Sequence, residues 1–103
     1  MAEEKPVAEV DRELEDLIPL FLHSRAQDLT GLTKGISEND FNALRSIGHN
    51  MKGIGSSFGF HRVSEIGDLI EMAALAGDLP TIQAQFALFQ DYMTRVEIKY
   101  VQN

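Results

Sequence analysis

The 103-residue sequence contains no cysteine and no tryptophan, and only three prolines. Without cysteine the chain can form neither a disulfide nor a thiolate metal site. It has no run of about 18 apolar residues, the length that a membrane-spanning helix needs. Its acidic first residues lack the apolar core of a signal peptide. We therefore expect one cytoplasmic domain with a single hydrophobic core.

Basic residues are also scarce, since nine Lys and Arg face sixteen Asp and Glu for a formal net charge of −7. Such a chain is a poor partner for nucleic acid or an anionic membrane. One window has the opposite balance. Between Asp40 and Glu65 no carboxylate occurs, whereas two histidines, two arginines and one lysine do. This window indicates a small anionic ligand or an acidic patch on a partner protein, unless the carboxylates are simply unevenly scattered.

The beginning of the chain is polar and shows no periodicity, so residues 1–9 are predicted to be a disordered tail preceding a domain at 10–103. Asp11 is expected to cap a short extra N-terminal helix. A long amphipathic helix should follow and run to about Lys34, where Gly35 is a stop signal. Its apolar residues recur at Ile18, Leu22, Ala26, Leu29 and Leu32, with Leu17 and Phe21 alongside.

Three further helices are predicted from apolar residues at steps of three and four. The second begins at Ser37 and ends before Gly59, and the third spans about His61 to Ala76. Asp78 should cap the fourth, whose apolar seam continues to Tyr100. No stretch alternates long enough to predict a strand. Because the links are short, the expected fold is all-α, an antiparallel up-and-down four-helix bundle.

The second of these helices contains an unusual segment, residues 47–60, with four of the eight glycines of the chain. A glycine inside a helix costs on the order of 1 kcal/mol relative to alanine. Such a sequence is favoured only where something must approach the backbone closely. His49 lies in the middle of this segment, and Lys52 follows three residues later on the same helix face. This arrangement predicts a histidine that an anionic group can reach from outside.

The motif His49-x-x-Lys52-Gly53, followed by Phe58-Gly59-Phe60, resembles the signature of histidine-containing phosphotransfer (HPt) domains. It is especially similar to the phosphotransfer domain of chemotaxis histidine kinases. With the helix order on either side, the resemblance covers roughly residues 10–102. It implies a phosphorelay protein that exchanges a phosphoryl group with a receiver domain of a response regulator or with a histidine kinase.

The resemblance also implies a role for each matching residue. His49 corresponds to the phosphoacceptor, and Lys52 to the lysine that stabilises the phosphoryl oxygens. Gly53 corresponds to the small residue that leaves room for the partner. Glu71 falls where the chemotaxis-type domains have a glutamate that orients the acceptor imidazole. Those domains carry a second histidine in this network, whereas this chain has Asp68 there.

Residue chemistry supports the same reading. A histidine attacks phosphorus through an unprotonated nitrogen, and a carboxylate that accepts the proton of the other nitrogen fixes the tautomer. Arg45 and Ser56 lie on the same stripe as His49, so both are candidates for partner binding. The sequence has no Walker-type phosphate loop. We therefore expect a monomeric phosphoryl carrier that is not an enzyme, with no cofactor of its own and Mg²⁺ held by the partner receiver.

Two other functions compete with this one. The chain could be an adaptor that binds a receiver or kinase through its glycine-rich face without being phosphorylated. It could also hold a metal ion with His49, His61 and Glu71. The metal site is disfavoured because these residues lack the helical spacing of such sites and because Lys52 and Arg45 would repel a cation.

Overall fold

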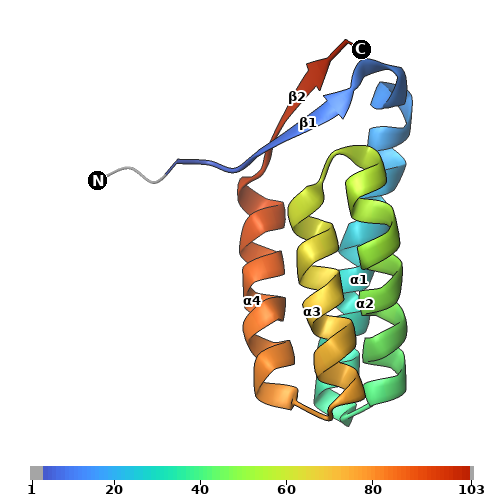
Figure 1. The fold of residues 1–103 in the computed structure, drawn as a ribbon, viewed down its shortest axis with the longest axis vertical. Coiled ribbons are helices and arrows are strands. Elements are labelled where there is room, and N and C mark those ends of the chain that lie inside the picture. Colours follow the sequence, from blue (N-terminus) through green and yellow to red (C-terminus); the bar gives the residue numbers. More distant parts are fainter. Residues whose placement is uncertain (1–3, 103) are drawn as a thin grey trace.

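The computed structural model describes residues 4–102 and contains four α-helices packed side by side. They are α1 (Ile18–Glu38), α2 (Phe41–Gly55), α3 (His61–Leu75) and α4 (Leu79–Arg95). The links between consecutive helices alternate between the two ends of the bundle (Figure 1). The predicted four-helix bundle is therefore confirmed at the level of its helices.

Two short strands at one end of the bundle contradict the prediction that no strand forms. β1 (Val7–Asp11) pairs in parallel with β2 (Glu97–Val101), with Val7 opposite Glu97 and Asp11 opposite Val101 (Figure 1). The predicted tail at residues 1–9 is thus wrong for 7–9, and its residues 1–3 lie outside the described part of the chain. Ala8 and Val10 are 1% and 0% exposed, so β1 is held by burial against the bundle as well as by pairing.

The second strand also shortens the fourth helix, whose apolar seam was predicted to reach Tyr100. α4 ends at Arg95 because Val96 takes an extended conformation with φ −64° and ψ 133°. The first four residues of β2, Glu-Ile-Lys-Tyr, alternate between exposed and half-buried positions, and Val101 is half-buried as well. Residues four positions apart lie on the same face of a helix and also on the same face of a strand. The spacing of Val96 and Tyr100 therefore did not exclude a strand.

Between β1 and α1 the chain forms a 3₁₀ helix, η1 (Arg12–Leu17), at the place where a short N-terminal helix was expected. The Asp11 side chain caps it by accepting a hydrogen bond from the backbone N–H of Glu13 at 2.9 Å. At the other end of the bundle α1 continues through Gly35 to Glu38, and Asn39 ends it with φ 53°. A Cβ on Gly35 would lie 2.7 Å from Leu44 Cδ2, so this glycine permits contact between α1 and α2 and is not a stop signal.

The second helix begins later than predicted. Ser37 still belongs to α1, and Asp40 is the residue that caps α2, accepting from the N–H of Ala43 at 3.1 Å. The predicted starts of the other two helices are confirmed, since α3 starts at His61 and Asp78 caps α4. A second 3₁₀ helix, η2 (Ser56–Phe58), links α2 to α3.

The core lies between the four helices and is closed at the strand end by aromatic side chains. Phe21 stacks on Phe58 and Phe60, with ring centroids 4.8 Å and 4.6 Å away. Ile18, Phe21 and Leu32 of α1 are buried, in agreement with the predicted pattern. Arg25 is also buried, with 6% exposed, whereas the predicted Ala26 is exposed. The Arg25 guanidinium bonds Asp28 at 2.7 Å and lies 4.8 Å from the ring of Phe21, which compensates its burial.

Candidate functional site

The site begins with an unusually close contact between the backbones of α2 and α3. A Cβ on Gly48 would lie 2.7 Å from the backbone nitrogen of Glu71 and 2.8 Å from the carbonyl oxygen of Gly67. On the facing helix, a Cβ on Gly67 would lie 2.6 Å from the backbone nitrogen of Lys52. Neither position can hold a side chain without pushing the helices apart. The two glycines therefore set the spacing across which α2 and α3 side chains meet.

The first pair brought together by this contact is His49 of α2 and Glu71 of α3. His49 Nδ1 lies 2.9 Å from Glu71 Oε2. Because a carboxylate only accepts hydrogen bonds, the neutral imidazole in this contact carries its single proton on Nδ1. The His49 side chain is 67% exposed and that of Glu71 16%. Nε2 has no bonding partner in the described part of the chain, so in the neutral ring its lone pair is free.

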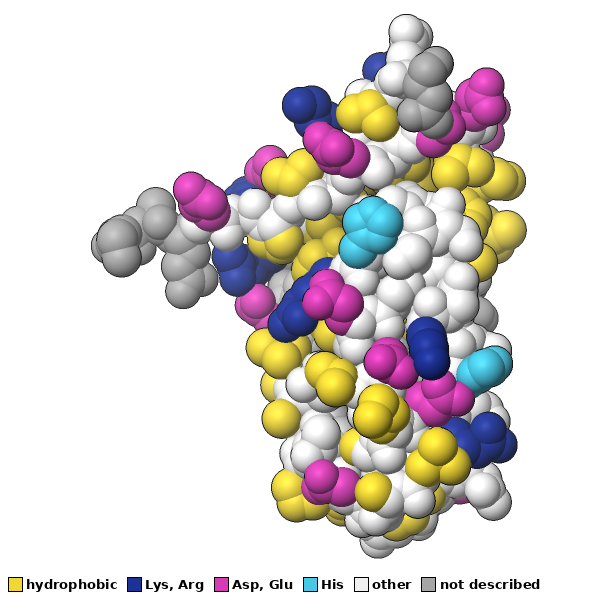
Figure 2. Space-filling view, viewed as in Figure 1, with side chains coloured by type: hydrophobic (Ala, Val, Ile, Leu, Met, Phe, Trp, Pro, Cys, Tyr) yellow, Lys and Arg dark blue, Asp and Glu magenta, His cyan; other side chains and the backbone are white. Residues whose placement is uncertain are grey.

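Lys52 completes a chain of charged groups on the same surface. Its Nζ lies 3.2 Å from Asp68 Oδ1 and 3.7 Å from Glu71 Oε1. The hydrogen bond to Asp68 and its negative charge, followed by the charge of Glu71, raise the pKa of Lys52 above its usual 10.5. Glu71 thus contacts the imidazole with one oxygen and the ammonium with the other. In Figure 2 histidine, basic and acidic side chains lie next to one another on the right of the face shown.

The surface next to His49 is open on the side of Gly53. A Cβ built on Gly53 has no atom within 4 Å, in contrast to Gly48 on the same helix. A hollow beside it is lined by Arg25, His49, Asn50, Gly53 and Ile54. Packing within the bundle therefore does not explain why position 53 is glycine. A small residue here leaves space for a group from outside.

The two other predicted partner-binding residues lie on either side of this opening. Arg45 is half-buried one turn before His49 and makes no hydrogen bond or ion pair among the described residues. Ser56 is tied into the turn between α2 and α3, because its N–H donates to Ser64 Oγ at 2.7 Å. Its hydroxyl lies 3.2 Å from His61 Nδ1.

His61 is therefore engaged with Ser56 and not with the pair formed by His49 and Glu71. Within residues 4–102 no three His, Cys, Asp or Glu side chains are gathered so that they could hold a metal ion. The competing metal hypothesis for His49, His61 and Glu71 finds no support in this arrangement. The position that replaces the second histidine, Asp68, contacts Lys52.

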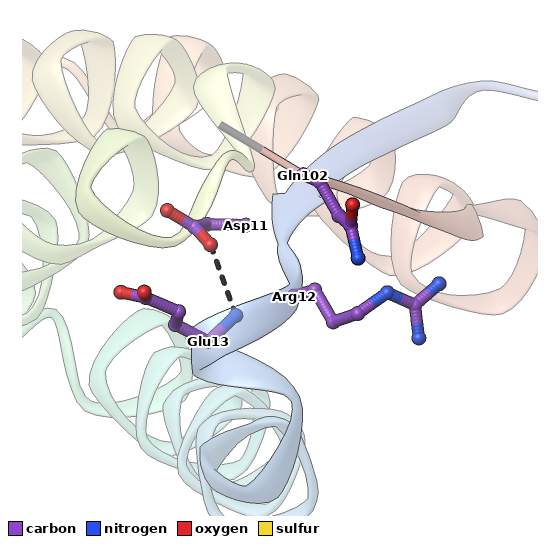
Figure 3. A pocket seen from close by; sticks show the side chains of 4 residues that line it. All are labelled: Asp11, Arg12, Glu13 and Gln102. Carbon is purple, nitrogen blue, oxygen red and sulfur yellow. Dashed lines mark hydrogen bonds between the residues drawn. The ribbon is translucent and has the colours of Figure 1, made fainter.

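A hollow at the strand end of the molecule is unrelated to this chemistry. It measures about 490 Å³ and is lined by Asp11, Arg12, Glu13 and Gln102 (Figure 3). The Asp11 carboxylate is turned toward the N–H of Glu13 that it caps, while the Arg12 side chain extends to the other side of the ribbon (Figure 3). The Arg12 guanidinium lies 5.8 Å from the centroid of the Tyr100 ring. These side chains serve the junction between β1 and η1, and none of them approaches His49.

Two residues of the site region were not identified from the sequence. Gly67 follows the buried Ile66 and is itself buried, and only its spacing of four from Val63 could have placed it on the contact face of α3. Arg25 lines the hollow beside His49 although arginine is rarely buried. No sequence signal separates it from a solvated arginine, except Asp28 three residues later.

A family of known proteins matches most of the chain. The family model described as the Hpt domain matches residues 7–98, which include both β1 and the first residues of β2. No curated protein and no solved structure matches the chain at a significant level. Across the described residues, none of the helices is both long enough and apolar enough to cross a bilayer.

Proposed function

The chain belongs to the Hpt domain family, and on this premise we propose that it carries a phosphoryl group on His49 within a two-component phosphorelay. Hpt domains serve histidine phosphotransfer in general. The finer proposal is that His49 exchanges the group with the aspartate of a response-regulator receiver domain, or accepts it from a histidine kinase. The observation that carries the proposal is the 2.9 Å contact between His49 Nδ1 and Glu71, which leaves Nε2 facing solvent.

The chemistry of the step follows from this contact. The lone pair of Nε2 attacks the phosphorus of the partner's aspartyl phosphate, the N–P bond forms, and the P–O bond to the aspartate breaks. The aspartate leaves as a carboxylate, and the imidazole, still protonated at Nδ1, gains positive charge. Glu71 offsets that charge through its hydrogen bond, so it orients the ring and raises the basicity of Nε2. The reverse transfer uses the same contacts.

The ammonium of Lys52 supplies charge stabilisation for the phosphoryl oxygens. Its position one helical turn from His49 places it on the same face, and the carboxylates of Asp68 and Glu71 keep it there. Asp68 is proposed to position this lysine instead of relaying a proton. Any Mg²⁺ in the reaction is expected in the acidic site of the partner receiver, with none bound by this chain.

The partner surface is proposed to include Arg45, Gly53 and Ser56. Gly53 provides the space in which the acidic site of a receiver could reach Nε2, since no atom occupies the position of its missing side chain. We further infer that the bundle is of the antiparallel up-and-down type, because its links alternate between two ends (Figure 1). Such a closed bundle is expected to act as a monomer.

A transfer assay with a phosphorylated receiver domain and Mg²⁺ tests the proposal. Wild-type protein should acquire acid-labile, alkali-stable phosphate, and His49→Gln should acquire none. His23→Gln, which changes an exposed histidine outside the site, is the matched control and should be labelled like wild type. Binding of the receiver without any labelling of the wild type would instead favour the adaptor function.

A further inference from the structure

A second cluster of hydrogen-bond donors lies where β1 meets α3 and α4, away from His49. A hollow of about 340 Å³ at this junction is lined by Pro6, Val7, Gly59, His61, Arg62 and Tyr92. An adjoining hollow shares Pro6, Arg62 and Tyr92 with it. In Figure 2 basic side chains lie in the angle between the strands and the helices on the left of this face. The carboxylates of the phosphoryl site are not among the residues that line either hollow.

The first donors are backbone groups at the beginning of α3. Phe60, the residue before the helix, provides no side-chain cap. The N–H of Val63 bonds the Phe60 carbonyl at 2.9 Å, whereas those of His61 and Arg62 have no acceptor in the described part of the chain. The N-terminus of this 15-residue helix therefore presents unsatisfied N–H groups together with the positive end of its dipole.

An independent observation comes from Tyr92 of α4, which lines both hollows. Tyr92 is only 7% exposed, yet its hydroxyl has no hydrogen-bond partner among the described residues. Its oxygen is not one of the fully enclosed polar atoms without a partner, so the hydroxyl is open to the hollows that Tyr92 lines and can donate to a group bound there. Burial raises the pKa of Tyr92 while the nearby Arg62 cation opposes that rise, so the phenol is protonated and can donate.

The charges around the hollow favour an anion. Arg62 is exposed and forms no ion pair among the described residues, so its charge is not neutralised. The other charged groups lining the adjoining hollow are two cations, Lys5 and Arg95, and two anions, Glu4 and Asp91. Arg95 pairs with Asp91 at 3.0 Å and Lys5 with Glu97 at 3.7 Å. Glu4 lines only the adjoining hollow, whereas Arg62 is the one residue among Lys, Arg, Asp and Glu that lines the first, so the charge at the mouth of the uncapped helix is positive.

We propose that this hollow is a binding site for a small oxyanion of the phosphate or carboxylate class. The oxyanion is held by the N–H groups of His61 and Arg62, by the Arg62 guanidinium and by the Tyr92 hydroxyl. Pro6 and Val7 form an apolar wall that can contact the body of an organic anion. The site is independent of phosphoryl transfer at His49, and either function can fail without the other.

The test is a titration of the whole chain with inorganic phosphate or with acetate at constant ionic strength, followed by ¹H–¹⁵N NMR. The amides of Gly59, His61 and Arg62 should shift and saturate with one of the two anions, which identifies the class of ligand. Arg62→Gln should weaken binding by about tenfold or more, because hydrogen bonds to charged groups are the strong ones. Arg12→Gln removes an equal charge at the η1 end and should leave the titration unchanged.

Tyr92→Phe separates binding from structure. It should weaken anion binding several-fold and leave the thermal midpoint of the free protein unchanged or higher, because the hydroxyl has no partner to lose. A lower midpoint for Tyr92→Phe would show that the hydroxyl has a structural partner and would overturn the proposal. Shifts that grow linearly without saturation, or equal binding by Arg62→Gln and wild type, would overturn it as well.

Discussion

Two glycines on one helix, Gly48 and Gly53, should respond in opposite directions to the same substitution. Both lie in α2, five residues apart, and neither has a positive φ that alanine could not adopt. They differ in what surrounds them. An added methyl group at position 53 meets no atom within 4 Å, whereas at position 48 it meets the backbone of α3 at 2.7 Å. Gly48 is therefore needed for the packing of α2 against α3, whereas Gly53 leaves space for a group from outside the domain.

The expected sizes follow from helix propensity and overpacking. Gly53→Ala removes the conformational cost of a helical glycine and should stabilise the domain by about 0.5–1 kcal/mol. For a domain of this size, that corresponds to a rise in the thermal midpoint of about 2–8 °C. Gly48→Ala has the same gain in helix propensity, but it forces the backbones of α2 and α3 apart. This overpacking should lower the stability of the domain by about 1–3 kcal/mol. Its midpoint should fall or at best remain level.

Thermal and urea unfolding followed by circular dichroism measures both variants. Gly53→Gln, made in parallel, should remain folded yet accept phosphate from a receiver far more slowly than Gly53→Ala, because only the larger side chain fills the opening. The proposed role of Gly53 would be contradicted if Gly53→Ala were clearly less stable than wild type, since the position would then be packed. It would also be refuted if Gly53→Gln transferred phosphate at the wild-type rate.

The remaining predictions concern the charged residues of the site. Glu71→Gln should keep the fold but slow phosphorylation by about tenfold, measured as initial labelling rate, because the amide cannot offset the imidazolium charge. Lys52→Ala should slow transfer without lowering the unfolding midpoint, since Lys52 is exposed; a loss of fold would contradict its placement on the outer face. Because the pKa of Lys52 is raised from 10.5, its effect on the rate should be fully present below that pH and be lost only as pH rises through the higher value. A decline that begins well below pH 10.5 and is absent in Lys52→Ala would contradict this.

Much of the site was predictable because its signals are local. Three- and four-residue spacing located α3 and α4, and the cap residues Asp11 and Asp78 were identified correctly. His49, Lys52 and Gly53 lie within one and a half turns of α2, so helical geometry alone places them on one face. Glu71 was reached only through the resemblance to a family, and the structure brings it to 2.9 Å from His49.

The parts that were not predictable depend on contacts between distant segments. The parallel pairing of β1 with β2 joins residues about 90 positions apart, and neither five-residue strand has a pattern long enough to stand out. The role of Gly67 depends on the crossing of α2 and α3, which the sequence does not specify. Arg25 illustrates a third limit. Its burial is offset by Asp28 and the ring of Phe21, and such compensation is visible only in three dimensions.

The central claim is that Glu71 holds His49 with its proton on Nδ1 and leaves Nε2 free to take the phosphoryl group. The most direct test is ¹H–¹⁵N NMR of the histidine side chains near neutral pH, before and after phosphorylation, with Glu71→Gln as the comparison. We predict the Nδ1–H tautomer of His49 in the free protein and a phosphorus coupling at Nε2 in the phosphorylated one. A phosphoryl group on Nδ1, or on any residue other than His49, would contradict it.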